Sequence, residues 1–157
     1  MKNLAVKNIN ELTALQFAAL QVLTVSEHQE ILGKSFKESV KDWESARDDQ
    51  VLGLCFLFDD QPIGITLFKK QSAHIASIHG LKIATPWQRR GFGHLAFRLA
   101  VEQLKAAWPD IKLLKLAVDA ENTPAIAIYQ AFGMNDSGPI FRGPNGQEHR
   151  MELQLKA

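Results

Sequence analysis

The chain has 157 residues, 46% hydrophobic and 22% charged, which is ordinary for a globular protein and suits one domain with one core over residues 1–157. Its 18 Lys and Arg residues nearly balance 17 Asp and Glu residues, giving a net charge of +1. This near-equal balance of charges argues against a nucleic-acid partner, because nucleic-acid binding usually requires a basic face.

The first quarter of the chain predicts one strand followed by helices. Residues 4–9 alternate apolar and polar side chains, as a strand does. Asn10 is the predicted N-cap of a helix that continues to Val22, because apolar residues recur there every three or four positions. Residues 26–47 are more polar and predict one or two amphipathic helices, with a break near Gly33.

The centre of the chain predicts three strands and a long helix. Residues 51–58 form a continuous apolar run, and a turn at 59–62 leads into a return strand at 63–69. Residues 74–85 predict the next strand, and a helix over 91–108 follows it.

The last third of the chain predicts a strand at 112–118, a helix and a closing hairpin. Asn122 opens the helix, Pro124 occupies its first turn and Gly133 ends it. Two strand-like runs then flank the turn at 143–146. The order of elements predicts an α/β fold with a mixed sheet, in which the strands at 74–85 and 112–118 run parallel around a crossover helix.

Cysteine usage and hydropathy bear on the compartment. Cys55 is the single cysteine and lies in an apolar run, so we expect a small core residue rather than a nucleophile. No apolar stretch reaches membrane-spanning length, and the N-terminus lacks a signal-peptide core. We expect a cytoplasmic protein with no membrane partner.

A glycine turn lies between the strand at 74–85 and the following helix. Residues 88–93 read Gln-Arg-Arg-Gly-Phe-Gly. The first N–H groups of a helix have no intrahelical partner, and the helix dipole places partial positive charge there. Glycine allows a close approach of the backbone to an anion, and Arg89 and Arg90 add two charges. The turn is therefore a candidate phosphate site.

Another motif begins at Asn122 and reads Asn-x-x-Ala-x-x-x-Tyr-x-x-x-Gly-Met. Ala125 and Tyr129 are four residues apart, so they lie on one face of the predicted helix. The two motifs, in this order and at this separation, resemble the GNAT superfamily of N-acetyltransferases. The glycine turn is similar to the acetyl-coenzyme A signature of that family, and the motif from Asn122 is similar to its other signature, with Met134 in place of phenylalanine.

The resemblance implies a GNAT-like fold, acetyl-CoA as co-substrate and no metal. It assigns backbone groups at the glycine turn to the pyrophosphate, backbone groups around Leu81 to Ile83 to the pantetheine arm, and Asn122 to the cofactor. The implied cofactor-binding residues are Leu81, Ile83, Gln88, Arg89, Arg90, Gly91, Phe92, Gly93 and Asn122.

The resemblance also implies catalytic roles. The tyrosine that matches Tyr129 sits near the thioester sulfur in the family and can protonate the leaving thiolate. Many members carry a glutamate general base where this chain has Ser77. His79 lies two residues on, on the same face of the strand, and a neutral histidine could take a proton from an ammonium group. His28, His74, His94 and His149 are weaker candidates.

Three other functions stay open. The chain could be a non-catalytic acyl-CoA sensor, a protein N-terminal or lysine acetyltransferase, or a nucleotide-binding module that uses only the glycine turn. Against the last, the Walker pattern and the third glycine of a dinucleotide fingerprint are absent from the sequence.

A homodimer formed through the last strands is also expected from the resemblance.

The charge of the early helices suggests the kind of acceptor. Residues 26–50 hold seven acidic residues (Glu27, Glu30, Glu38, Asp42, Glu44, Asp48 and Asp49) and four basic ones (Lys34, Lys37, Lys41 and Arg47). Glu38 and Asp42 lie four apart, where like charges repel and a nearby cation would relieve them. We therefore expect a small-molecule amine acceptor that is cationic, such as a polyamine, an aminoglycoside or a lysine-like amine.

Overall fold

The computed structural model describes residues 3–26, 34–46, 49–137, 141–143 and 146–155. Among these residues, eight strands form one mixed sheet in the order β1-β2-β3-β4-β5-β8-β6, with β7 paired to β8. The strands are β1 (Leu4–Asn8), β2 (Val51–Phe58), β3 (Gln61–Lys70), β4 (Ile75–Ile83), β5 (Leu113–Asp119), β6 (Asn135–Asp136), β7 (Phe141–Gly143) and β8 (Gly146–Gln154). The expected mixed α/β sheet is confirmed.

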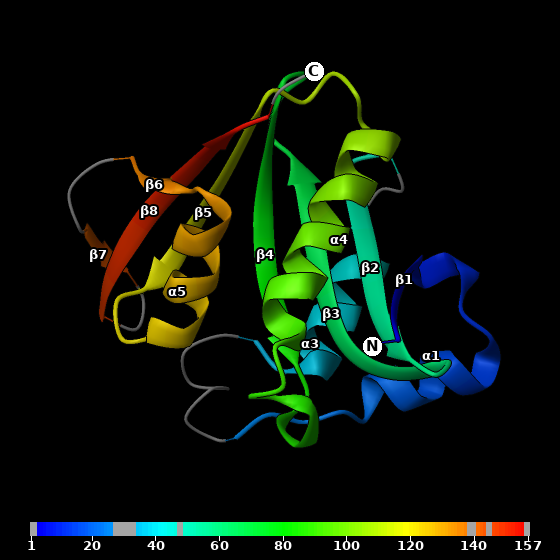
Figure 1. Cartoon of the computed structure of the whole chain (residues 1–157). Helices are drawn as coiled ribbons and strands as arrows, with labels where there is room; N and C mark the ends of the chain where they lie inside the picture. The colour runs from blue at the N-terminus through cyan, green and yellow to red at the C-terminus, as the bar shows by residue number, and fades with distance from the viewer. Residues whose placement is uncertain (1–2, 27–33, 47–48, 138–140, 144–145, 156–157) are drawn as a thin grey trace.

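The helices cover both faces of the sheet. α4 (Phe92–Ala107) and α5 (Thr123–Phe132) lie on one face, and α1 (Ala14–Gln21) and α3 (Phe36–Glu44) lie on the other (Figure 1). Two short 3₁₀ turns, η1 (Ile9–Glu11) and η2 (Thr85–Trp87), follow β1 and β4. The predicted crossover is also confirmed, because β4, α4 and β5 follow one another and β4 pairs with β5 in parallel.

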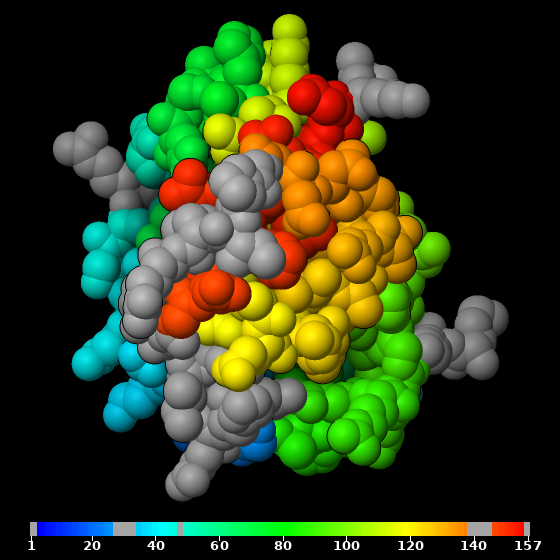
Figure 2. Space-filling model, turned by 90° about the vertical axis from the view of Figure 1, so that its left-hand side faces the viewer, coloured from blue at the N-terminus to red at the C-terminus, as the bar shows by residue number. Residues whose placement is uncertain are grey.

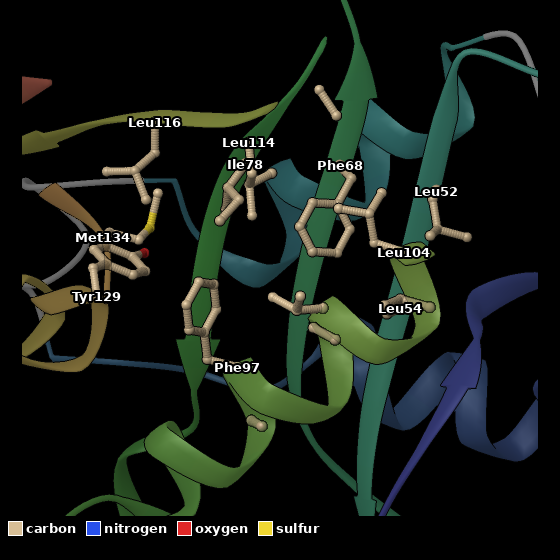
Figure 3. Close-up of a cluster of buried hydrophobic side chains, with 14 of the residues drawn as sticks. Leu52, Leu54, Phe68, Ile78, Phe97, Leu104, Leu114, Leu116, Tyr129 and Met134 are labelled. Atoms are coloured by element: carbon tan, nitrogen blue, oxygen red, sulfur yellow. The ribbon is translucent and has the colours of Figure 1, made fainter. Parts of the chain in front are cut away.

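Each face of the sheet has its own hydrophobic core, because side chains alternate along the strands. On the α4 side, Leu52, Leu54 and Phe68 of the strands pack with Phe97 and Leu104 of the helix (Figure 3). The core on the α1 and α3 side includes Phe36, Val40, Cys55, Ile65 and Leu67. The strand β2 is apolar throughout because it contributes to both cores, and Cys55 is fully buried, as expected of a core residue.

The start of the chain differs from the sequence prediction. Asn10 is not a helix N-cap: Asn8 caps the 3₁₀ turn in a capping box with Glu11, and Thr13 caps α1 in a second capping box with Gln16. Both boxes satisfy two backbone donors at once, which fixes the boundaries. The predicted break at Gly33 and the first part of the predicted helix at 26–47 lie outside the described residues, whereas the second part forms α3.

The end of the chain follows the prediction closely. The side chain of Asn122 caps α5 by accepting from the Ala125 amide, Pro124 lies in its first turn, and Gly133 ends the helix in the left-handed conformation with φ 109°. The predicted closing hairpin is present, since Gly143 pairs with Gly146. The short strand β6 was not predicted.

Candidate active site

The sheet opens between its two parallel strands. β4 and β5 pair only at their first residues, from Ile75 opposite Leu113 to Ser77 opposite Lys115, and then diverge (Figure 1). Gly80 lies where the register of β4 against β3 shifts, and it has a φ of 75°. A glycine with positive φ at such a shift forms a β-bulge, which bends the strand. The bulge explains why β4 leaves β5 and exposes its edge.

The glycine turn lies at the carboxyl end of β4. Arg89 and Gly91 both have positive φ, 62° and 79°, and Gly91 is the N-cap of α4 without any side-chain cap. The turn therefore leaves the helix N-terminus available to an anion. Arg90 lies over the ring of Trp87, with its guanidinium carbon 5.2 Å from the ring centroid, and the Phe92 side chain is buried in the core. Gln88 donates to the carbonyl of Ile83 at 2.7 Å, which ties the turn to β4.

One pocket joins the two sequence motifs. It has a volume of about 790 Å³, and Figure 2 shows the start of α5 beside the segment that holds η2 and the start of α4. Of the predicted site residues, the pocket is lined by His79, Leu81, Ile83, Gln88, Arg89, Gly91, Gly93, Asn122 and Tyr129. Arg90 and Phe92 are the two predicted residues that do not line it.

The other candidate histidines differ in whether they line the pocket. His94 lines the pocket, whereas His74, bonded to the Asp110 carbonyl, and His149, 3.4 Å from Asp136, do not line it. His28 lies outside the described residues.

Tyr129 lies on α5 beside Met134, and its ring meets Phe97 edge-on at a centroid distance of 5.3 Å (Figure 3). Its side chain is 5% exposed and has no hydrogen-bond partner among the described residues. Burial raises the pKa of its phenol far above the usual range. The hydroxyl is therefore protonated at neutral pH, and Tyr129 lines the pocket.

His79 and Ser77 share a hydrogen bond on the opposite face of β4. The Ser77 Oγ lies 2.8 Å from Nε2 of His79. Desolvation by the surrounding protein and the nearby charge of Lys69 lower the pKa of His79, while Asp42 acts weakly in the opposite direction. The imidazole is therefore neutral at neutral pH and is able to accept a proton.

Glu38 and Asp42 of α3 are already engaged by groups of the chain, contrary to the sequence interpretation. Asp42 binds Lys69 at 2.9 Å and Lys34 at 3.1 Å. Burial raises the pKa of Asp42, but the bonds from the two lysines outweigh it and the net pKa is lowered. Glu38 is engaged in the capping box with Ser35, and its pKa is lowered by those hydrogen bonds. The cations that relieve this pair belong to the chain itself.

Sequence reasoning missed several residues of the site, and those with a special backbone or a charged side chain are Gly80, Lys82, Asp119 and Glu148. Lys82 donates to the Ser39 hydroxyl at 2.7 Å, and desolvation together with the charge of Lys34 lowers its pKa to about 8. A glycine inside a strand pattern is a signal for a bulge and could have pointed to Gly80. Among the described residues, no three His, Cys, Asp or Glu side chains could hold a metal ion, and no helix is long and apolar enough to span a membrane.

Several solved structures share this fold. Spermidine N-acetyltransferase from Vibrio cholerae, in complex with CoA and spermine, has a TM-score of 0.75 at 16% identity over 97% of this chain and 95% of that one. Aminoglycoside acetyltransferase AAC(6')-Ib, in complex with Parmomycin and acetyl-CoA, has a TM-score of 0.75 at 15% identity over 97% and 93%. Campylobacter jejuni N-acetyltransferase PseH with acetyl coenzyme A has 0.68 at 18% identity over 98% and 99%. None of the curated proteins compared with the chain matches it.

These structures share with the chain a mixed sheet that opens beside a helix N-terminus, and the likeness shows the fold. The model of the family described as the acetyltransferase (GNAT) family matches residues 17–134, which is most of the chain. The chain therefore belongs to the GNAT family, as its two motifs predicted, and is an N-acetyltransferase with acetyl-CoA as co-substrate.

Proposed function

We propose that this enzyme transfers the acetyl group of acetyl-CoA to a primary amine of a small molecule. One observation carries the proposal. A single pocket of about 790 Å³ is lined by the glycine turn, by Tyr129 on one face of the sheet and by His79 on the other. Cofactor, acid and base would then meet across the opening between β4 and β5.

The chain's own groups fit the thioester cofactor. Backbone N–H groups at the start of α4, with Arg89 beside them, would hold the pyrophosphate. The free edge of β4 from Leu81 to Ile83 offers backbone groups to the pantetheine arm, and Asn122 lines the same pocket. These contacts would hold the thioester still, and positioning two bound substrates supplies much of the rate in such transfers.

His79 and Tyr129 would divide the proton transfers. His79, neutral because its pKa is lowered, would take a proton from the incoming ammonium directly or through water. The amine nitrogen then forms a bond to the thioester carbonyl carbon, the C–S bond breaks, and the second proton of the nitrogen passes to solvent, so that the product is a neutral amide. Tyr129, which lines the pocket and whose phenol is protonated at neutral pH, would give its proton to the leaving thiolate and take one back from solvent.

We further propose a cationic acceptor such as a polyamine. The support is the likeness to a spermidine N-acetyltransferase and to an aminoglycoside acetyltransferase, together with carboxylates elsewhere in the pocket. Asp42 of α3, which is already bound to two lysines, gives no such support. The expected single domain over residues 1–157 and the expected homodimer remain proposals, and light scattering tests the dimer.

The experiment is an amine panel with acetyl-CoA, in which free thiol and acetylated amine are both measured. The panel includes spermidine, an aminoglycoside, a lysine peptide and a neutral amine. Cofactor binding without any turnover would favour an acyl-CoA sensor, and preference for the peptide would favour a protein acetyltransferase. Tighter binding of ATP or NAD than of acetyl-CoA would contradict the proposal.

A further inference from the structure

Asp119, the last residue of β5, has a buried carboxylate oxygen without a partner. The residue is 5% exposed and lines the pocket. Its Oδ1 accepts from the Glu121 amide at 2.9 Å, whereas its Oδ2 has no hydrogen-bond partner among the described residues. A buried carboxylate oxygen without a hydrogen-bond donor is unfavourable. A donor group of a ligand bound in the pocket that Asp119 lines would therefore stabilise it.

Glu148 of β8 stands opposite Asp119 and lines the same pocket. Directly opposed residues of an antiparallel pair project from the same face, and like charges there destabilise the sheet. Glu148 makes no ion pair with any described residue. A cation between the two carboxylates would relieve their repulsion.

The strand register places this pair on the face where the amine would arrive. Ser77 and Lys115 are paired across β4 and β5, so they share a face. Alternation along the strands puts His79 on that face of β4 and Asp119 on that face of β5. Tyr129 packs into the core on the opposite face, with α4. The proposed base and the two carboxylates therefore lie on the same face.

The wall of the pocket formed by Lys34, α3 and β4 carries more positive than negative charge, unlike the wall with Asp119 and Glu148. Its described charged groups are Lys34, Asp42 and Lys82, and Asp42 is already bound to two lysines. The unpaired carboxylates of the described pocket are thus on the β5 and β8 wall. An acceptor with charge at both ends would direct its second ammonium group to that wall.

We propose that Asp119 and Glu148 anchor a second ammonium group of the acceptor, so that the enzyme prefers diamines and polyamines to monoamines. This inference rests on the proposed function, and it names the acceptor class. The reacting amine would lie near His79 while the distal ammonium lies between the two carboxylates.

The test compares three amines that differ only at the far end: 1,4-diaminobutane, butylamine and 4-aminobutyrate, with the diamines of three and five carbons to find the best length. We expect the diamine to exceed butylamine in kcat/KM by about tenfold or more, the weight of one charge-assisted hydrogen bond. Asp119→Asn and Glu148→Gln keep shape and remove charge, and each should cut the diamine-to-butylamine ratio toward one. Glu102→Gln, on the exposed side of α4, is the matched control and should leave the ratio unchanged.

A further measurement is of binding alone and does not require turnover. Calorimetry measures binding of 1,4-diaminobutane to the CoA-saturated protein, and Asp119→Asn or Glu148→Gln should weaken it. If butylamine is acetylated with the same kcat/KM as the diamine, the inference is wrong while the proposed function stands. If 4-aminobutyrate has the highest kcat/KM of the three, Lys34 and Lys82 select the acceptor and the inference is wrong. If no amine is acetylated but diamine binding still depends on the two carboxylates, the anchor stands and the proposed function fails. Loss of folding in Asp119→Asn leaves Glu148→Gln to decide.

Discussion

Ser77 Oγ lies 2.8 Å from Nε2 of His79, two residues further along the same face of β4. The hydrogen bond holds the imidazole at the pocket wall, at the end where β4 parts from β5. Desolvation and the charge of Lys69 lower the pKa of His79 below its ordinary value of 6.5. A histidine so placed is unprotonated through the neutral range.

We expect His79→Gln to lower kcat/KM by roughly 10²–10⁴, as loss of a general base does. In the wild type, kcat/KM should fall only at pH below 6.5, because the lowered pKa keeps the base form above that point. The variant should lose this acidic limb. Ser77→Ala keeps the imidazole and should cause a smaller loss. A pH–rate profile with the same acidic limb in His79→Gln would show that another group is the base.

Tyr129→Phe should lower kcat by roughly 10²–10⁴ while acetyl-CoA still raises the melting temperature. Phenylalanine keeps the edge-on contact with Phe97, and Tyr129 has no hydrogen bond to lose among the described residues. The change should therefore affect stability little. Steady-state kinetics and thermal denaturation check both parts, and an unchanged kcat would contradict the assigned role.

The sequence predicts local structure well here and long-range contacts poorly. The crossover and the helix from Asn122 to Gly133 follow from spacing and caps within a short stretch. The cap at Thr13 was missed because Asn8, Asn10 and Thr13 compete within six positions, although Thr13 with Gln16 fits the capping-box pattern.

The charges of the pocket depend on folding. Asp42 meets Lys69 from another element, and Asp119 meets Glu148 only through the β5–β8 register. Sequence spacing alone pairs Asp42 with Glu38 on the same helix, which led to the wrong interpretation of α3.

Arg89 and Arg90 are adjacent but should differ in their effect on the cofactor. Arg89 lines the pocket, whereas Arg90 lies over Trp87. Arg89→Asn, which tolerates the positive φ of 62°, should raise the Kd for acetyl-CoA about tenfold. Arg90→Gln should raise it less. Thermal shift over a range of acetyl-CoA concentrations gives both constants, since a hundredfold excess over Kd stabilises by about 2.7 kcal/mol. Equal effects would mean that the turn acts by net charge alone.

Gly91 should be required for its backbone. Gly91→Val places a β-branched residue at φ 79° and should destabilise the fold, so loss of binding in that variant is ambiguous. Gly91→Asn is the informative change, because asparagine tolerates this conformation and caps helix N-termini. Its side chain would take the amides that the pyrophosphate needs. We expect a folded protein whose melting temperature no longer responds to acetyl-CoA, and a full response would refute the anion-site assignment.

Cys55 should be inert in the native protein. Its side chain is fully buried, and burial raises the pKa of the thiol to about 12. The thiolate that reacts with a disulfide reagent is therefore scarce and inaccessible. We expect no labelling by such a reagent in buffer and one equivalent after denaturation, and labelling of the folded protein would contradict this. An inert Cys55 also means that free thiol in the activity assay reports coenzyme A alone.

Asp42 should tune the pH dependence rather than bind the acceptor. Its charge raises the pKa of His79, while Lys69 and Lys34 lower it. Asp42→Asn removes the raising charge and leaves both lysines without their partner, so both effects lower the pKa of His79 further. We expect the acidic limb of kcat/KM to move to lower pH, with the ranking of amines unchanged. Glu44→Gln, on the same helix but exposed, should leave the profile as it is. Titration of the His79 imidazole by NMR gives the pKa directly, and a shift to higher pH in Asp42→Asn would overturn this electrostatic account of the base.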